Sequence, residues 1–275
     1  MTRLRISAIS YLNTAPLLWD FEHGPARDSF EITYTLPSQC ARELAAGQAD
    51  IGIIPVAAYA SIPGLLILPG VAIASKRAVR SILLVSSKAM EEICSVALDS
   101  SSLTSVALAR ILFQKWWGGE RQFESLEPCL DTMLTNHDAA MLIGDRALAV
   151  DRSRYRTWDL AEEWIRFTGK AFVFAFWAVR EEALRKSNLD LERMFQDSRD
   201  HGLMARNRER IAHTWSQKLG LEEREIESYL TRNIHYRLDE ECLSGLQLFY
   251  RYAFESKVLP SIPELRFLSR EPALI

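Results

Sequence analysis

The chain has 275 residues, of which 48% are hydrophobic and 25% charged, with a formal net charge of -3 and a pI near 6.0. This composition is typical of a globular protein with a substantial core. The weakly acidic balance argues against nucleic acid or an anionic membrane as a partner, and no stretch approaches 18 uninterrupted apolar residues, so we predict no membrane span.

The cysteines and histidines indicate neither a disulfide framework nor a metal site. The four cysteines lie far apart with no C-x-x-C pair, and the five histidines show no H-E-x-x-H spacing. We therefore expect free thiols in a reducing compartment and no metal. Asn13, Pro16 and Asp20 interrupt the apolar run near the N-terminus, and no cleavage pattern follows, so we expect a cytoplasmic protein.

Short apolar runs alternate with helical patterns through the first 180 residues. Predicted strands cover residues 4–10, 30–36, 49–55, 65–75, 80–87, 95–99, 123–127, 138–145 and 171–180. Strands that alternate with helices predict an α/β fold with a largely parallel sheet. Residues 181–256 are charged, strand-poor and helically periodic, which predicts several helices packed on one lobe.

An internal repeat indicates two lobes. The segments ARELAAGQADIGIIPVAAYA and LDTMLTNHDAAMLIGDRALA each place a short helix, a turn and an aspartate (Asp50, Asp138) before an apolar strand and a new helix. This plan is similar to that of type 2 periplasmic-binding-protein lobes, with mixed, mostly parallel sheets and flanking helices. We expect one lobe from residues 1–88 with 177–275, a second from 89–176, and a ligand cleft between them, because ligands bind at the carboxyl edges of such sheets.

Four predicted strand-to-helix elbows face this cleft, and their hydroxyls and free N–H groups suit an anion. The most telling is DSSSLTSVALARIL, whose hydroxyls either cap the helix or bind a carboxylate. The candidate ligand-binding residues in the four elbows are Ser10, Tyr11, Thr14, Pro55, Val56, Ser102, Leu103, Thr104, Ser105, Gly144 and Asp145.

Three polar residues have two readings each. Asn13 is either a turn residue or an amide donor to a ligand. Ser86 either ends a strand in a turn or presents a hydroxyl to the cleft. Asp145 is better explained as a helix N-cap than as a catalytic acid. No G-x-G-x-x-G, P-loop or G-x-S-x-G motif is present, so we expect no nucleotide cofactor. No general base lies in any of the four elbows.

Four stretches resemble the chorismate dehydratase family: SYLNTAPL, SSLTSVALARIL, AMLIGDRAL and DLAEEWIRFTGKAFVFAFWAVR, within residues 4 to about 256. The resemblance implies a two-lobed enzyme of the futalosine route to menaquinone. This hydro-lyase would convert chorismate into 3-[(1-carboxyvinyl)oxy]benzoate and water without a cofactor or metal. It would act on this small molecule, either as a monomer or as a homodimer.

On this chemistry we hypothesise that the substrate's own side-chain carboxylate takes the ring proton. Asn13 and Ser86 would be catalytic and hold that carboxylate or the departing hydroxyl. Either Phe174 or Trp177 is expected to wall the pocket. The alternative function is a cytoplasmic or exported binding protein for a small carboxylate, which would share the fold and the anion-binding cleft.

Overall fold

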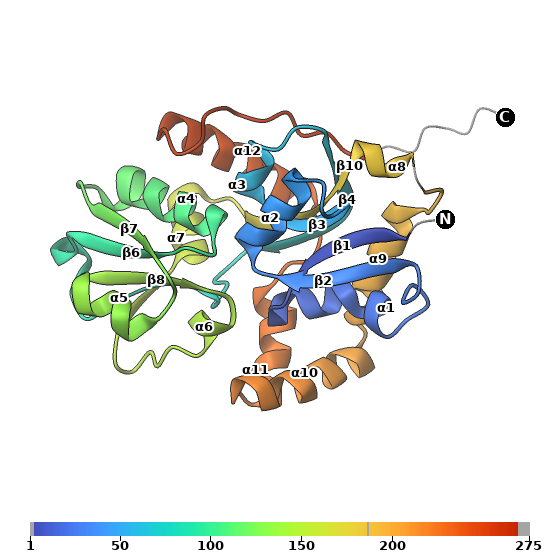
Figure 1. The fold of residues 1–275 in the computed structure, drawn as a ribbon. Helices are drawn as coiled ribbons and strands as arrows, with labels where there is room; N and C mark the ends of the chain where they lie inside the picture. The colour runs from blue at the N-terminus through green and yellow to red at the C-terminus, as the bar shows by residue number, and fades with distance from the viewer. Residues whose placement is uncertain (1–2, 186, 269–275) are drawn as a thin grey trace.

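Two five-stranded β-sheets with flanking helices form two lobes that lie side by side (Figure 1). The structure is a computed structural model that describes residues 3–185 and 187–268. The first sheet has the order β2-β1-β3-β10-β4 and the second the order β7-β6-β8-β5-β9. The strands are β1 (Leu4–Ile9), β2 (Phe30–Thr35), β3 (Ile51–Pro55), β4 (Leu65–Ser75), β5 (Ile82–Ser86), β6 (Ser95–Asp99), β7 (Gln122–Leu126), β8 (Ala139–Ile143), β9 (Arg156–Asp159) and β10 (Phe172–Arg180).

The two sheets have the same mixed pairing pattern. In the first, β1 is parallel to β2 and β3, while β10 is antiparallel to β3 and β4. In the second, β6 is parallel to β7 and β8, while β5 is antiparallel to β8 and β9. The predicted two-lobed α/β fold with mixed sheets is therefore confirmed. Strand β9 is not evident from the sequence, because it has only four residues and little apolar content.

The two aspartates of the internal repeat have matching roles. The Asp50 carboxylate accepts a 3.0 Å hydrogen bond from the backbone N–H of Arg5, at the start of β1. The Asp138 carboxylate accepts one of 2.9 Å from the backbone N–H of Ser95, at the start of β6. Each aspartate thus fixes the strand that follows it to its parallel neighbour.

Helices surround both sheets, and a long helical region follows β10. The helices are η1 (Leu12–Leu18), α1 (Trp19–Glu22), α2 (Pro37–Ala45), α3 (Val56–Tyr59), η2 (Met90–Glu92), α4 (Leu103–Leu112), η3 (Phe113–Trp117), α5 (Leu130–Asn136), α6 (Gly144–Leu148), α7 (Leu160–Thr168), α8 (Glu181–Leu184), α9 (Leu191–Gly202), α10 (Ala205–Leu219), α11 (Glu223–Ser228), η4 (Tyr229–Asn233) and α12 (Glu240–Glu255). In the part of the chain that the structure describes, none of them is long and apolar enough to cross a membrane.

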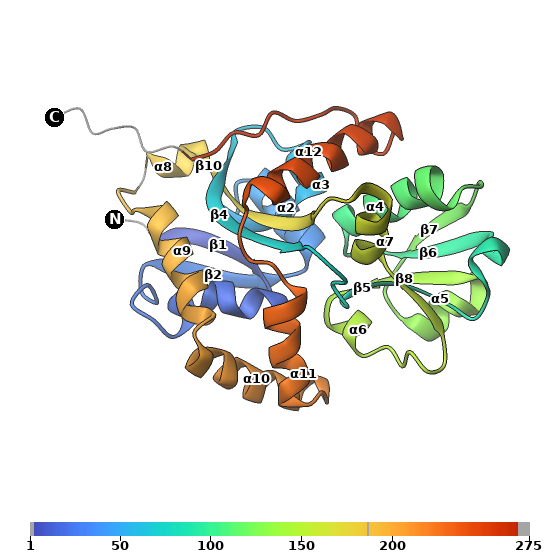
Figure 2. The same cartoon turned by 180° about the vertical axis from the view of Figure 1, so that it is seen from behind.

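Aromatic side chains attach the helical C-terminal region to the first lobe. Phe195 of α9 packs against Phe21 and Trp177, with ring centroids 4.7 and 4.9 Å apart. Phe249 of α12 packs edge-on against Phe172 of β10 at 5.3 Å. Such pairs add roughly 0.5–1.5 kcal/mol each beyond the area that they bury. Figure 2 shows α12 crossing beside β10, with α9, α10 and α11 along the lower part of the same lobe.

The chain crosses between the sheets twice, after β4 and before β10. Strand β5 pairs with β8 and β9, although the sequence analysis placed residues 82–86 in the first lobe. Residues 172–176 of β10, expected in the second lobe, pair within the first sheet. On sheet membership we therefore propose the lobe boundaries at residues 76–81 and 169–171.

Asp159 anchors the first crossing segment to the second lobe. Its buried carboxylate accepts hydrogen bonds from the backbone N–H groups of Val79 and Arg80 in one segment. It also caps α7 by accepting from Ala161 and Glu162 at 3.1 Å each. One side chain thus ties the first connection between the lobes to the N-terminus of α7.

Candidate functional site

A small cavity lies between the lobes, where strands of both sheets reach their ends. Its volume is about 60 Å³. The polar side chains that line it are Tyr11, Asn13, Ser81, Ser102, Thr104 and Ser105. Its apolar walls include Ile9, Pro37, Pro55, Ile73, Val79, Ile82, Ile143 and Phe174. None of the described residues that line it carries a charged side chain, so hydroxyls, amides and backbone groups define its chemistry.

The lobes are closed over this cavity. Three hydrogen bonds join them beside it: Leu12 N–H to Asp145 Oδ1 at 3.1 Å, Ser38 N–H to the Ser101 carbonyl at 3.1 Å, and Ala57 N–H to Thr104 Oγ1 at 3.2 Å. A cavity of this volume holds a few water molecules at most. A larger ligand therefore requires the lobes to separate and close again around it.

A chain of polar groups from both ends of the sequence reaches the cavity. The Thr14 hydroxyl donates to Asn13 Oδ1 at 3.2 Å, which orients the amide. The Asn13 side chain also interacts with the hydroxyl of Tyr229. That hydroxyl in turn donates to Ser81 Oγ at 2.9 Å. Because Tyr229 is the donor in this bond, the proton of the Ser81 hydroxyl is not used in it.

Tyr229 stays protonated in this network. Its ring comes from η4 and is buried, and burial raises the pKa of its hydroxyl well above the ordinary value. Neither Tyr229 nor Ser81 is evident as a site residue from the sequence pattern. The one local signal was Ser81 directly before the apolar run ILLVS, at the crossing between the lobes.

Ser86 does not reach the cavity, so its predicted catalytic role is not retained. Its hydroxyl donates to the Asp138 carbonyl at 2.6 Å and accepts from the Lys88 N–H at 2.9 Å. It lies at the opposite end of β5 from Ile82, which does line the cavity. The structure therefore supports the interpretation of Ser86 as a turn residue, and of the two serines that flank β5 it is Ser81 that lines the cavity.

Most hydroxyls in the loop before α4 and in its first turn form hydrogen bonds within the protein. Ser102 caps the helix by accepting from the Ser105 N–H at 3.2 Å. The Thr104 hydroxyl donates to the Phe174 carbonyl at 3.1 Å. Ser101 is engaged by Asp99 through both its N–H and its hydroxyl. What remains for a ligand is the Ser105 hydroxyl and the positive end of α4.

The other predicted residues divide between the cavity and its surroundings. Tyr11, Pro55 and Gly144 line it, whereas Thr14 lies buried behind Asn13. The remaining three residues lie outside the cavity: Ser10 is exposed, Val56 is buried with its carbonyl accepting from Tyr250 at 2.7 Å, and Leu103 is 41% exposed in a separate groove.

Asp145 joins the lobes and is not an N-cap as expected. Helix α6 has no side-chain cap, and the Asp145 carboxylate instead accepts from the backbone N–H of Leu12. Burial raises the pKa of this carboxyl to about 6, and the Leu12 hydrogen bond opposes the rise. Next to it, the Tyr11 ring packs over Gly144, where an added Cβ would lie 2.9 Å from the ring. The elbow at Gly144 and Asp145 therefore both lines the cavity and helps to hold the two lobes together.

Phe174 and Trp177 of β10 occupy different environments. Phe174 lines the cavity. Trp177 is fully buried against Phe195 of α9, away from it. Phe174 is thus the residue that walls the site.

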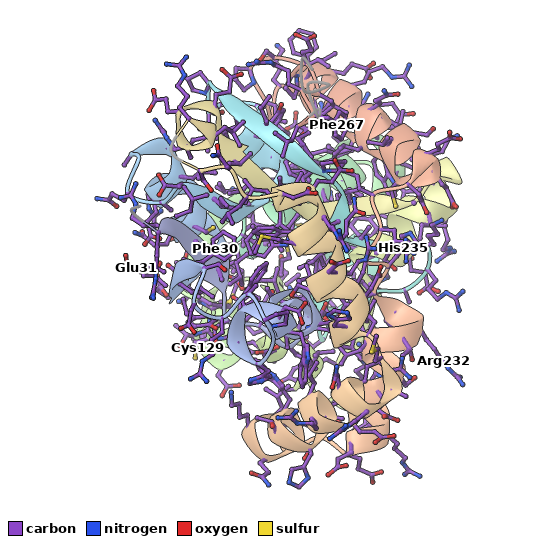
Figure 3. The ribbon with its side chains drawn as sticks, turned by 90° about the vertical axis from the view of Figure 1, so that its right-hand side faces the viewer. Phe30, Glu31, Cys129, Arg232, His235 and Phe267 are labelled. Atoms are coloured by element: carbon purple, nitrogen blue, oxygen red, sulfur yellow. The ribbon has the colours of Figure 1, made fainter. Side chains whose placement is uncertain are left out.

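A second cluster of polar side chains lies away from the cavity. Among the described residues, His235, Asp239 and Cys242 bring three possible metal ligands within 4.8 Å of one another. However, Lys76 Nζ already binds Asp239 at 2.8 Å, and Asp239 caps α12 through the Cys242 N–H. Burial raises the pKa of the Cys242 thiol to about 12, which disfavours the thiolate that a metal requires. These contacts fit an ion pair and a helix cap. Figure 3 labels His235 beside the C-terminal helices and shows Glu31 and Arg232 at the surface.

Comparison with known proteins places this chain in a menaquinone biosynthesis family. A sequence family described as menaquinone biosynthesis matches residues 4–255. A protein of Thermus thermophilus named chorismate dehydratase is 29% identical over 257 residues, which cover 87% of this chain and 91% of that protein.

Solved structures share the fold at low identity. A protein from Archaeoglobus fulgidus has a TM-score of 0.75 at 15% identity and covers 94% of this chain and 98% of its own. The alkanesulfonate-binding protein SsuA of Xanthomonas axonopodis, bound to MOPS, has a TM-score of 0.68 at 17% identity, over 97% and 96% of the two chains. A Candida albicans protein with the generic periplasmic binding protein fold has a TM-score of 0.65 at 12% identity over both full chains.

Proposed function

Since the chain belongs to the menaquinone biosynthesis family, we propose that it is a chorismate dehydratase. It would eliminate water from chorismate to give 3-[(1-carboxyvinyl)oxy]benzoate, as a hydro-lyase of the futalosine route that acts in the cytoplasm. The relative of that name supports the substrate. The observation that carries the proposal is the Asn13–Tyr229–Ser81 network at the interlobe cavity.

The lining of the cavity suits a dicarboxylate that also carries a hydroxyl. One carboxylate would bind at the N-terminus of α4, where Ser102, Thr104 and Ser105 line the cavity. The second would accept from the Asn13 amide. Because none of the described side chains that line the cavity is charged, closure would leave these dipoles to act in a site with little water, where they are strongest.

The reaction requires one proton and one hydroxyl to leave neighbouring ring carbons. The C–H bond at the enolpyruvyl-ether carbon breaks, its electron pair forms the new ring double bond, and the neighbouring C–O bond breaks. The enolpyruvyl carboxylate of the substrate accepts the proton and passes it to the departing hydroxyl, which leaves as water. The ring becomes aromatic, so the protein needs only to orient these groups and polarise the hydroxyl.

Ser81 is the residue that we assign to the departing hydroxyl. Tyr229 donates to Ser81 and is kept protonated by burial, so the Ser81 proton is directed away from Tyr229. Ser81 thereby donates to negative charge that develops on the leaving oxygen. Asn13 would hold the enolpyruvyl carboxylate in reach of the ring proton.

Product identification tests this proposal. The purified protein is incubated with chorismate, and the products are separated by chromatography and weighed by mass spectrometry. Loss of one water to give an enolpyruvyl-bearing benzoate is the expected result. Chorismate that binds in calorimetry but stays intact would instead support the binding-protein alternative.

A further inference from the structure

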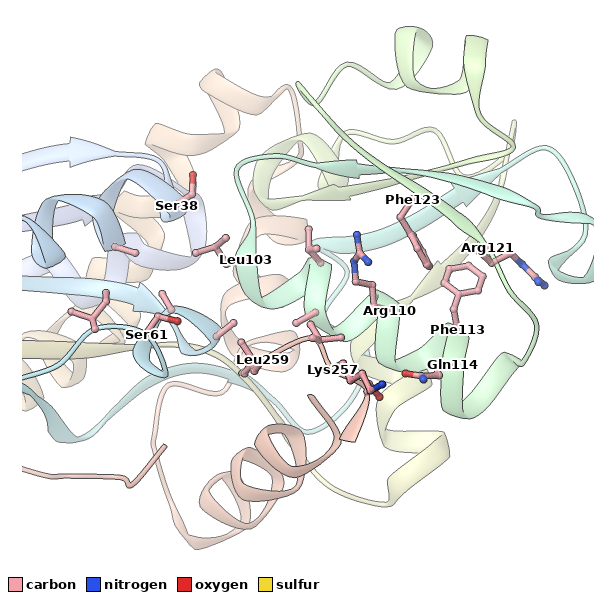
Figure 4. A pocket seen from close by; sticks show the side chains of 18 of the residues that line it. Ser38, Ser61, Leu103, Arg110, Phe113, Gln114, Arg121, Phe123, Lys257 and Leu259 are labelled. Atoms are coloured by element: carbon pink, nitrogen blue, oxygen red, sulfur yellow. The ribbon is translucent and has the colours of Figure 1, made fainter. Parts of the chain in front are cut away.

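A second and much larger hollow lies on the outer side of the lobe interface, with a volume of about 910 Å³ (Figure 4). Its floor consists of small apolar side chains from α2 and α3 of the first lobe and from α4 of the second. The segment after α12 closes one side with Val258 and Leu259. Small-molecule sites typically have volumes of roughly 300–1,000 Å³ and such apolar linings.

The charges around this hollow are strongly unbalanced. Four cationic side chains line it and a single acidic one: Arg42, Arg110, Arg121 and Lys257 against Glu120. Within the described chain, neither Arg110 nor Lys257 forms an ion pair with an acidic side chain. Arg110 instead lies over the Phe123 ring, with its guanidinium carbon 4.9 Å from the ring centroid. This stacking holds the guanidinium at the wall and leaves its edges available for a carboxylate.

Lys257 has a backbone conformation that normally belongs to glycine. Its φ is +56°, and it follows the C-terminal residues of α12. The Lys257 N–H bonds to the Phe254 carbonyl and the Val258 N–H to the Ala253 carbonyl, which is the Schellman arrangement. Glycine is the favoured residue there. The lysine at this position puts an ammonium group beside the hollow, next to Ser256, whose buried hydroxyl has no partner among the described residues.

We propose that this hollow binds a small amphipathic carboxylate, with its apolar part on the α2–α3–α4 floor and its carboxylate at the cationic rim that includes Arg110 and Lys257. The unbalanced charge selects an anion, and the alanine-rich floor selects an apolar body. Because α3 and α4 belong to different lobes, such a ligand bridges them. Beside it, the bonds Ser38–Ser101 and Ala57–Thr104 close the interlobe cavity, so occupancy favours the closed lobes.

The test compares three eight-carbon probes: octanoate, octanol and octylammonium. Binding to the full chain is followed by titration calorimetry in the absence of chorismate, so the result does not depend on the proposed function. We expect octanoate to bind with one molecule per chain, and octanol and octylammonium to bind at least about tenfold more weakly. Equal binding of octanoate and octanol, or no saturable binding of octanoate, would overturn the proposal.

Variants locate the site. Val106→Trp, in α4 at the floor, should abolish octanoate binding by filling the hollow, and Arg110→Gln should weaken it about tenfold. Lys257→Gly should weaken octanoate binding while raising the unfolding temperature, so the lost affinity cannot arise from misfolding. The matched control is Arg154→Gln, because Arg154 is also exposed and stacks on a ring, that of Tyr155, but lies elsewhere. Octanoate binding that Arg110→Gln and Lys257→Gly leave unchanged would contradict the assignment.

Discussion

The Tyr229 hydroxyl donates a 2.9 Å hydrogen bond to the Ser81 hydroxyl, between residues 148 positions apart in the chain. Tyr229 is buried in the C-terminal helical region, and Ser81 lies where the chain first crosses between the lobes. The helices that follow β10 therefore supply part of the site and do more than cover the first lobe.

The first prediction contrasts two serines of the same strand region. Ser81→Ala should lower kcat by about 100-fold, because removal of one donor to developing negative charge typically has this effect. Ser86→Ala should leave kcat within about twofold, since its hydroxyl serves only the turn at Asp138. Steady-state assays with chorismate measure both. Equal losses in the two variants would contradict the assignment of Ser81.

The second prediction concerns Tyr229 as a positioning residue. Tyr229→Phe leaves the ring in place but removes the donor to Ser81, so we expect kcat to fall about tenfold with KM little changed. A purely structural role would instead lower stability and leave kcat unaltered. The kcat and KM of the variant and its unfolding temperature, measured together, separate the two.

Most of the fold could be predicted from the sequence, whereas the site could be predicted only in part. Strands such as 65–75 and 95–99 were found because they are apolar runs with clear ends. Asn13 was found because an elbow after a strand is a local pattern. Tyr229 could not be found in this way, because its position at the cavity arises from helix packing across the whole chain. The sequence pattern pointed to Ser86 and not to Ser81, although both flank the same strand, because only the pairing of β5 shows which end faces the cavity.

The third prediction follows from the pKa of Asp145. Its carboxyl has a pKa of about 6 in the folded protein against 3.8 ordinarily, so the folded state holds the proton more tightly. Stability from this group is therefore present below the lower value and lost as pH rises through about 6. The loss is at most about 3 kcal/mol at neutral pH.

Asp145→Asn remains neutral and can still accept from Leu12. We expect its free energy of unfolding to exceed that of the wild type at pH 7.5, and the difference to shrink at pH 4.5. Urea denaturation of both proteins at the two pH values measures this. A difference that is the same at both would exclude Asp145 as the source of the pH dependence.

The fourth prediction compares adjacent glutamates of α7. The buried carboxylate of Glu163 accepts from the indole N–H groups of Trp116 and Trp117 at 2.9 and 3.3 Å and pairs with Arg166 at 2.7 Å. Glu163→Ala should therefore destabilise the fold by about 2–3 kcal/mol. The exposed neighbour gives the control, since Glu162→Ala should stay within about 0.5 kcal/mol. Denaturant unfolding that ranks the two variants equally would show that the Glu163 contacts add no stability.

The most direct measurement uses chorismate carrying deuterium at the ring carbon that bears the enolpyruvyl ether. The account predicts that the product has lost the deuterium and is lighter than the substrate by one singly deuterated water. This product should form more slowly than the product of unlabelled chorismate. The Ser81→Ala variant should show a marked loss of this turnover. A benzoate that retains the deuterium, or labelled chorismate recovered intact after hours with the wild-type protein, would contradict dehydration at this site.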